Sequence, residues 1–235
     1  MNKISKLTSV SAGVLLACAF AAHATPIQNF SNSGGSGSGA FNAEADFTVG
    51  NGTVTLVLKN LQQDPISAGQ LISGLSFSIS SLTGSAVLSS SSGNVANIAA
   101  DGTYTAPGSA TSPLPRWHVS GTSGTTVSMT ALGGGQPSDL IIGADSKGGF
   151  NGAGVYDKQN ASIGNFEPSI LGSATFIFAL TGVTVDSQIT HVMFSYGTGP
   201  DTTSQGSKVP DSGLTVAMLG AGLIGLIGIR RKFAR

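Results

Sequence analysis

Few residues in this sequence are of types that perform chemistry, and they are scattered. Three acids, Asp139, Asp145 and Asp157, fall within a Gly-rich segment, and carboxylates and loop carbonyls are the ligands that Ca²⁺ prefers. Their spacing matches neither an EF-hand nor a nonapeptide calcium repeat, so solvated loop acids are the simpler interpretation. His118 and His191 stand far apart, outside any metal-binding spacing. We therefore predict no metal and no cofactor, with the three acids as a weak Ca²⁺ candidate.

Motifs for nucleophilic or nucleotide chemistry are also missing. The sequence is rich in Ser, yet it contains no G-x-S-x-G elbow and no phosphate-binding G-K-S/T loop. One G-x-G-x-x-G pattern starts at Gly220, but it lies in an apolar stretch with no preceding strand, so it is not a dinucleotide site. We predict that the protein is not an enzyme. A hydrolase built from two facing carboxylates is the weakest alternative, because sequence spacing identifies no such pair.

Aromatic residues offer a possible glycan platform. Arg116, Trp117 and His118 are consecutive, and an exposed cluster of this kind stacks on a sugar ring. Tyr104 and Tyr156 are two further candidates for the same surface. The competing interpretation is a core Trp with polar strand neighbours. A secreted carbohydrate-binding module is therefore the alternative function that we keep.

The charge balance excludes nucleic acid as a partner. Only 9% of the 235 residues are charged, and the formal net charge is zero. Between residues 25 and 208 there are five basic and ten acidic residues, so the central part of the chain is mildly acidic. An acidic body does not attract phosphate backbones.

The N-terminus has the three parts of a secretory signal peptide. Lys3 and Lys6 precede an apolar stretch, which ends in the small-x-small cleavage signal of Ala22 and Ala24. We predict a signal peptide over residues 1–24, removed by signal peptidase after export through the Sec machinery. Cys18, the only Cys in the chain, loosely resembles the lipidated Cys of a lipobox, and removal with the signal peptide is the other interpretation.

The C-terminus predicts a membrane helix. Residues 214–229 form a sixteen-residue stretch without charge, which is at the short limit of roughly 17 to 25 residues for a span. A basic tail over residues 230–235 follows, with Arg230, Arg231, Lys232 and Arg235. Because cations stay on the cytoplasmic side at both ends, we expect residues 25 to about 209 to lie beyond the inner membrane.

A pentapeptide precedes the apolar stretch. It consists of Val209, Pro210, Asp211, Ser212 and Gly213. Pro210 keeps Val209 extended, and the three residues after the Pro are small and turn-prone. With the apolar stretch and the Arg cluster, residues 209–235 resemble the PEP-CTERM sorting domain of bacterial surface proteins, in its VPDSG-CTERM variant.

The resemblance implies a processing route. Proteins of this class are substrates of an exosortase, a membrane-embedded cysteine protease or transpeptidase. It releases the body from the helix and can transfer it to another carrier. The resemblance also implies a Gram-negative bacterium that makes exopolysaccharide. Such a protein is tethered to the inner membrane in transit and ends at the cell surface or outside the cell.

Period-two alternation dominates the body and predicts strands. Phe41 to Val49 and Val54 to Leu58 alternate apolar with polar residues around a Gly50-Asn51-Gly52 turn, which favours a hairpin. Further strands are expected near residues 75–79, 127–131, 174–180 and 189–196. We predict an all-β protein with a single β-sandwich or jelly-roll-like body over residues 40–208. Residues 25–39, which are rich in Ser and Gly, are predicted to be a linker.

These observations lead to one functional expectation. The protein is an exported, exosortase-processed surface or extracellular-matrix protein with a structural role, associated with exopolysaccharide or biofilm. Its expected partners are the export and processing enzymes and the membrane, with exopolysaccharide as a further candidate.

Overall fold

The computed structural model describes residues 27–106, 109–147, 149–150, 152–156, 163–199 and 202–210. These residues form strands and two short 3-10 helices, η1 (Ala68–Gln70) and η2 (Gly164–Phe166), and contain no α-helix. The predicted all-β class is therefore confirmed.

The strands in the described part of the chain are β1 (Ile27–Ser36), β2 (Gly39–Gly50), β3 (Thr53–Asn60), β4 (Ile72–Ile79), β5 (Ala86–Ala96), β6 (Thr103–Thr105), β7 (His118–Ser123), β8 (Thr126–Thr130), β9 (Leu140–Ile142), β10 (Ala153–Val155), β11 (Ser169–Leu180), β12 (Ile189–Tyr196), β13 (Thr203–Gln205) and β14 (Ser207–Lys208).

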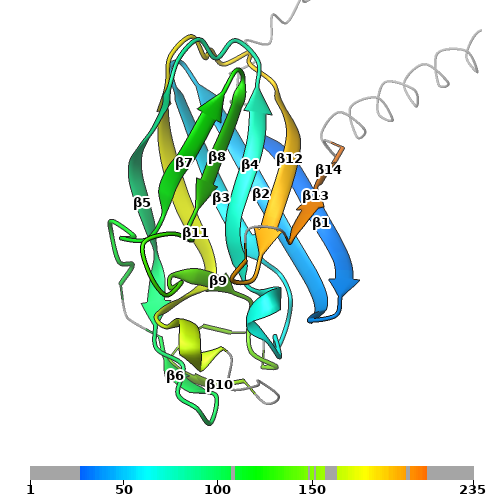
Figure 1. Ribbon diagram of the computed structural model, residues 1–235, viewed down its shortest axis with the longest axis vertical. Coiled ribbons are helices and arrows are strands. Elements are labelled where there is room, and N and C mark those ends of the chain that lie inside the picture. The colour runs from blue at the N-terminus through cyan, green and yellow to red at the C-terminus, as the bar shows by residue number, and fades with distance from the viewer. Residues whose placement is uncertain are drawn as a thin grey trace, which may run out of the picture.

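A 12-stranded sheet contains all of these strands except β6 and β10, which form a separate two-stranded ladder. One arm of the large sheet has the order β7-β8-β4-β12-β13, and the other has the order β5-β11-β3-β2-β1-β14. β9 joins the arms: it pairs parallel with β11 and meets β4 only where Ile141 faces Ile72. Figure 1 shows the arms with their labels.

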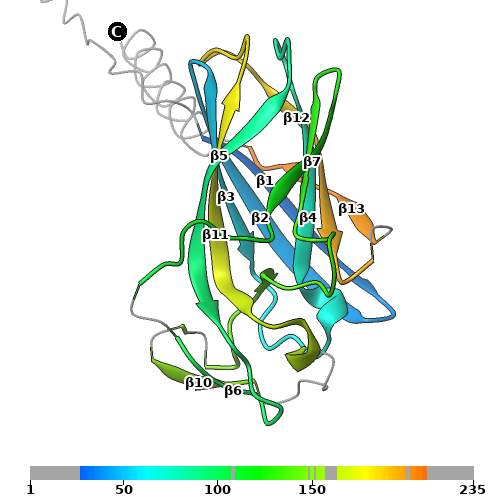
Figure 2. The same cartoon turned by 60° about the vertical axis from the view of Figure 1, so that its left-hand side comes forward.

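Aromatic side chains from the two arms meet in the core. The ring of Phe77 on β4 lies 5.0 Å from that of Phe47 on β2 and 5.7 Å from that of Phe178 on β11, centroid to centroid. These are ordinary distances for favourable aromatic pairs, and all three side chains are fully buried. Figure 2 shows β5, β11, β3 and β2 beside each other, with β7, β4 and β12 across from them. The arms therefore bury one shared core.

The predicted hairpin and the strand predicted at 174–180 are confirmed. β2 and β3 pair antiparallel from Ala43–Asn60 to Gly50–Thr53, and Gly52 in the turn has a φ of +69°, a conformation that Gly adopts at little cost. The strand predicted at 174–180 lies in β11, which hydrogen bonds to β3 on one side and β5 on the other. The remaining predicted strands lie in β4, β8 and β12.

The linker predicted for residues 25–39 is wrong for the residues that the structure describes. Ile27–Ser36 form β1, which pairs with β2 along its whole length. Side chains outside the hairpin hold its Gly-rich tip: the Gln70 amide donates to the carbonyl oxygen of Ala40 at 2.5 Å, and the Ser67 hydroxyl donates to that of Ser38 at 2.7 Å. Tertiary bonds thus offset the low strand propensity of Ser and Gly, and the folded body includes residues 27–39, which lie outside the predicted bounds of 40–208.

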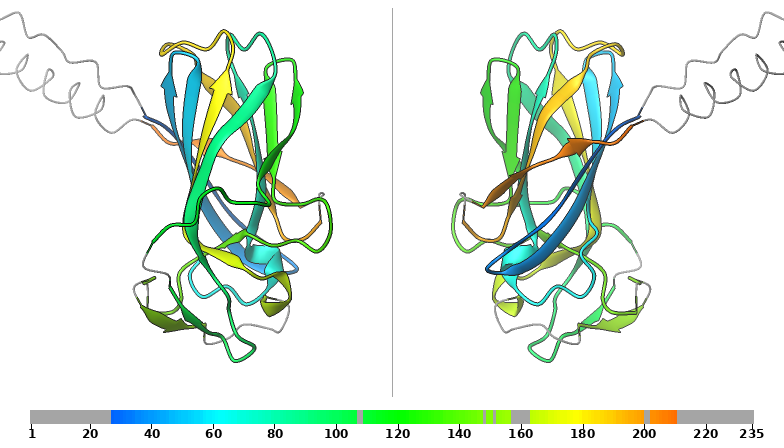
Figure 3. Two further views of the ribbon diagram at one scale, coloured as in Figure 1. Left: turned by 90° about the vertical axis from the view of Figure 1, so that its left-hand side faces the viewer. Right: turned by 90° about the vertical axis from the view of Figure 1, so that its right-hand side faces the viewer.

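The body is elongated, and its two ends differ. Figure 3 shows the β6–β10 ladder at one end of the long axis, whereas β14 and the start of β1 lie toward the other end. The two ends of the described chain also lie side by side in the sheet, because β14 pairs antiparallel with β1.

Candidate functional site

The chain leaves the folded body through β14 at the edge of the sheet. Lys208 lies opposite Phe30, and Ser207 lies opposite Ser31. One further bond follows, in which the backbone N–H of Val209 donates to the carbonyl oxygen of Asn29 at 2.9 Å. Pro210 has no N–H, so its nitrogen cannot extend this ladder. The pentapeptide therefore begins at the last backbone bond between this segment and β1 that the structure describes.

A buried amide holds the segment that leads to β14. Asn32 on β1 is 5% exposed, and its NH₂ group donates to the Ser204 hydroxyl at 3.0 Å and to the Gln205 carbonyl at 2.7 Å. Its carbonyl oxygen accepts from the Tyr196 hydroxyl at 2.8 Å. Asn32 thus ties β1 to both β12 and β13, which belong to the opposite arm.

Gly206 allows one short segment to bridge the two arms. β13 pairs with β12, β14 pairs with β1, and only Gly206 separates them. Its N–H donates to the Val192 carbonyl at 2.8 Å. A Cβ at this position would lie 2.7 Å from the ring of Phe194, which is fully buried. A side chain here would displace either the segment or the ring.

The start of β1 is anchored next to the same edge. The amide of Gln28 donates to the Ser187 carbonyl at 3.0 Å and accepts from the backbone N–H of Ile189 at 2.8 Å. Gln28 follows the predicted signal-cleavage site by four residues. Because β1 also pairs with β14, the segment after that site and the segment before the pentapeptide are adjacent in the fold.

Most of the predicted targeting residues lie outside the described part of the chain. These are Ala22 and Ala24 of the signal-cleavage site, Asp211, Ser212 and Gly213 of the pentapeptide, the apolar stretch 214–229, and the basic residues Arg230, Arg231, Lys232 and Arg235. Among the residues that are described, no helix has the length and apolarity that crossing a bilayer requires.

The predicted glycan platform is wrong, because its three rings are buried. Trp117 is 3% exposed, Tyr104 4% and Tyr156 1%. The Trp117 ring packs against Phe176 with centroids 4.8 Å apart, and its Nε1–H donates to the Asp139 carbonyl at 2.7 Å. The interpretation as a core Trp with polar neighbours is the one that the structure supports.

Asp139 is a buried structural acid. Its carboxylate accepts a hydrogen bond from the backbone N–H of Arg116 at 3.3 Å, while the Arg116 guanidinium reaches Ser138 and Gly134 instead. Burial raises the pKa of the Asp139 carboxyl, and the bond from Arg116 and its charge partly oppose that rise.

Tyr104 and Tyr156 build the lobe around the β6–β10 ladder. Their rings lie 5.2 Å apart, and the Tyr104 ring covers Gly154, where a Cβ would lie 2.3 Å from it. The Tyr156 hydroxyl donates to the Gly143 carbonyl at 2.8 Å. Burial, followed by the nearby charge of Asp145, raises the pKa of Tyr104 to about 12.

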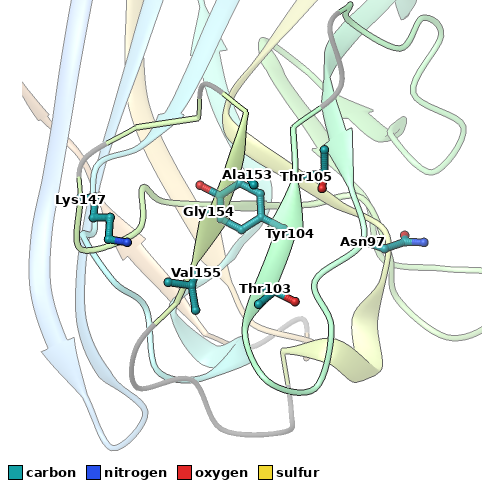
Figure 4. A pocket seen from close by; sticks show the side chains of 8 residues that line it. All are labelled: Asn97, Thr103, Tyr104, Thr105, Lys147, Ala153, Gly154 and Val155. Carbon is teal, nitrogen blue, oxygen red and sulfur yellow. The ribbon is translucent and has the colours of Figure 1, made fainter.

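The buried carboxylate of Asp145 organises the loop of this lobe. It accepts bonds from the Tyr104 hydroxyl at 3.2 Å and from the backbone N–H groups of Lys147 and Val155 at 3.0 and 3.4 Å. Beside it lies a shallow, open pocket of about 610 Å³. Figure 4 shows its lining side chains: Asn97, Thr103, Tyr104, Thr105, Lys147, Ala153, Gly154 and Val155. Because protein donors already surround Asp145, the pocket offers polar groups but no free carboxylate from this residue.

The weak Ca²⁺ candidate gains no support. Asp139 and Asp145 bond to different partners, and Asp157 lies outside the described residues. In the part of the chain that the structure describes, no three His, Cys, Asp or Glu side chains come together in a way that could hold a metal.

The sequence did not predict the residues that hold the segment from β13 to β14 against β1. Asn32 falls in a Ser-, Asn- and Gly-rich run that was interpreted as a linker, and β14 is too short to produce an alternating pattern. The one feature of the sequence that could have indicated this segment is Gly206, a lone Gly between two short polar stretches just before the pentapeptide.

The comparison with protein families identifies the C-terminal segment. Residues 208–233 match the family model described as the VPDSG-CTERM motif, which confirms the resemblance found in the sequence. The chain therefore carries a C-terminal sorting signal of the kind found on exported proteins. No curated protein and no solved structure gives a significant match to the chain.

Proposed function

We propose that this chain is a non-enzymatic structural protein of the cell surface or extracellular matrix, processed by an exosortase. The observation that carries the proposal is the position of the sorting motif: it starts at residue 208, and the last described bond to the body is made by Val209. A folded body thus reaches directly to the motif. Cleavage there leaves β14 and the bridge across Gly206 with the released body.

The order of events follows from the two ends. The Sec machinery exports the chain of a Gram-negative bacterium, and signal peptidase cuts after Ala24. Residues 214–229 then hold the chain in the inner membrane, with residues 230–235 in the cytoplasm. The exosortase acts on the pentapeptide, and the body moves to the surface or into the exopolysaccharide matrix.

The body suits a structural role. We infer that its two arms are the layers of a β-sandwich related to a jelly roll. The ring contacts of Phe77 with Phe47 and Phe178 support this architecture, because they join strands of opposite arms. Low charge and an outer surface rich in Ser and Thr favour contact with uncharged polymers over ionic partners.

Intact mass spectrometry of the native protein tests the processing route. Protein released from the cell surface is expected to lack residues 1–24 and residues 214–229. A full-length chain that accumulates in the inner membrane would contradict the proposal.

A pair of variants tests whether the motif itself is read. Replacing Pro210 and Asp211 with Ala should retain the chain in the inner membrane. The matched control is Ser207→Ala, which lies in β14 just before the motif and is exposed. It should be released like the parent chain. Equal release of both variants would show that the pentapeptide is not the processing signal.

A further inference from the structure

A groove lies on the outer face of the arm that contains β4, β8 and β12. It has a volume of about 380 Å³ and is lined by Leu75, Ser76, Ser120, Ser128, Met129, Thr130, Leu132, Ser195 and Thr203. Figure 1 shows the strands that form it side by side, from β7 through β8, β4 and β12 to β13. A volume of several hundred Å³ is typical of small-molecule sites.

Strand alternation places the hydroxyls on this face. On β4 the buried Leu75 and Phe77 flank Ser76, and on β8 the buried Val127 and Met129 flank Ser128. Because neighbours along a strand point to opposite faces, both serines point outward. The register sets them directly opposite each other, with neighbouring strands about 4.8 Å apart.

Most of these hydroxyls have no protein partner. The Thr130 hydroxyl donates to the Ser73 carbonyl at 3.1 Å and accepts from the Leu132 N–H at 2.9 Å. Within the described residues, no hydrogen bond engages the other five groove hydroxyls, which are those of Ser76, Ser120, Ser128, Ser195 and Thr203. Further along the same face, by contrast, the Ser78 and Thr126 hydroxyls bond to each other at 2.8 Å.

Two glycines lie opposite residues that line the groove. Gly74 lies between Thr130 on β8 and Ser195 on β12 in the register. A Cβ on Gly74 would lie 2.9 Å from the backbone oxygen of Met129 and 3.3 Å from Cβ of Ser195. A side chain at residue 74 would therefore force the backbone or Ser195 to shift. Gly121, opposite Ser128, also adds no side chain, and a Cβ there would meet nothing within 4 Å.

We propose that this groove binds a short segment of a neutral polysaccharide. A hydroxyl both donates and accepts hydrogen bonds, which matches the hydroxyls of a sugar. None of the lining residues is Asp, Glu, Lys or Arg, so an acidic or basic polymer finds no counter-charge. An apolar peptide or lipid would cover the hydroxyls without replacing their hydrogen bonds to water. Burying hydroxyls without such bonds costs free energy. Leu132 and the carbon atoms along the groove floor contact the C–H faces of the sugars.

The ligand class rests on the proposed extracellular role, because polysaccharide surrounds the protein there. Binding is measured on the purified full chain in a non-ionic detergent that carries no sugar. A failure of processing therefore leaves the binding test intact, and a failure of binding leaves the processing route intact.

The test uses defined hexasaccharides. Maltohexaose, cellohexaose and mannohexaose are the neutral probes, and hexagalacturonate and hexameric chitosan are the charged ones. At least one neutral probe is expected to bind, with an affinity that changes little between low and high salt because no ion pair forms. Ser76→Ala combined with Ser195→Ala should weaken binding about tenfold or more, through two lost hydrogen-bonding groups.

A matched control removes two hydroxyls from the opposite arm. Ser90 and Ser92 lie on β5 and point away from the core, so Ser90→Ala combined with Ser92→Ala should bind like the parent chain. Equal affinity of the groove variant and the parent chain would overturn the proposal. So would the absence of binding to all three neutral probes, or binding to a charged probe only.

Discussion

The backbone N–H of Val209 donates to the carbonyl oxygen of Asn29 at 2.9 Å, and this bond joins the first residue of the pentapeptide to the first strand of the body. The motif is therefore not separated from the fold by a spacer. Whatever stabilises the segment from β13 to β14 also fixes where the motif emerges.

Adding a methyl group at residue 206 should loosen the bridge between the arms. The Cβ of Gly206→Ala would lie 2.7 Å from the ring of the buried Phe194, and overpacking of this kind costs about 1–3 kcal/mol. Urea unfolding of the full chain in detergent measures the loss, followed by the fluorescence of Trp117, the only Trp in the sequence. Gly199→Ala is the control, because a Cβ there would meet nothing within 4 Å. Similar stabilities for the two variants would contradict the described packing.

Removing the amide of Asn32 should free the same segment from β1. Asn32→Ala loses bonds to Ser204, Gln205 and Tyr196, and leaving such buried groups unsatisfied costs about 1–3 kcal/mol. Hydrogen exchange should show faster exchange of the Val209 amide. Asn94→Ala on β5 is the control and should leave that amide unchanged. Unaltered protection of Val209 in Asn32→Ala would show that the amide does not hold β14.

Two buried serines should respond to the same substitution in opposite ways. The hydroxyl of Ser73 is buried with no hydrogen-bond partner among the described residues, so Ser73→Ala should stabilise the protein slightly, by less than about 1 kcal/mol. The hydroxyl of Ser91 accepts a bond from the backbone N–H of Leu114 at 3.0 Å. Ser91→Ala should therefore destabilise it by about 1–3 kcal/mol. Urea midpoints that change in the same direction would contradict this contrast.

The tyrosines should titrate late in the native state. Burial raises the pKa of Tyr104 to about 12 and raises the pKa values of Tyr156 and Tyr196 as well. These three are the only tyrosines in the chain. Tyrosinate absorbance at 295 nm should therefore stay low at pH 11 in the native protein, whereas the chain unfolded in guanidinium titrates near pH 10.

The sign of the pH dependence follows from the same shift. Between about pH 10 and 12 the unfolded chain loses tyrosine protons that the folded chain keeps, so the free energy of unfolding falls as pH rises. Tyr104→Phe should flatten this fall. A stability that is constant between pH 9 and 12 in the parent chain would refute the burial of these side chains.

Alternation was sufficient to find the strands that bury one complete face. β2, β3 and β8 alternate along nearly their whole length, whereas β4 alternates from Leu75 and β12 from Val192. The predicted strand at 174–180 lies in β11, where burial also alternates. The buried role of Trp117 was open in the sequence, because a Trp beside Arg and His occurs both in cores and on binding surfaces. Only its contacts with Phe176 and Asp139 decide the matter.

Sequence patterns could not find the strands that tertiary bonds hold in place. β1 is rich in Ser, Asn and Gly at its distal half, and it forms because β2 pairs along its whole length. β14 is two residues long and depends on β1. The groove was equally hidden, although Ser76, Ser128 and Thr130 stand in visible alternation. Which strands lie side by side, and hence which hydroxyls converge, is set by the register and not by local pattern.

The placement of the two ends of the body has a consequence for its orientation. β14 leads to the sorting motif, and the β6–β10 ladder lies toward the opposite end of the long axis (Figure 3). In the proposed route, a body fastened through its C-terminal edge would hold the β6–β10 ladder far from the attachment. In that arrangement the ladder would be the first part of the body to meet a neighbouring cell or fibre, and the hydroxyl groove would face sideways along the flank.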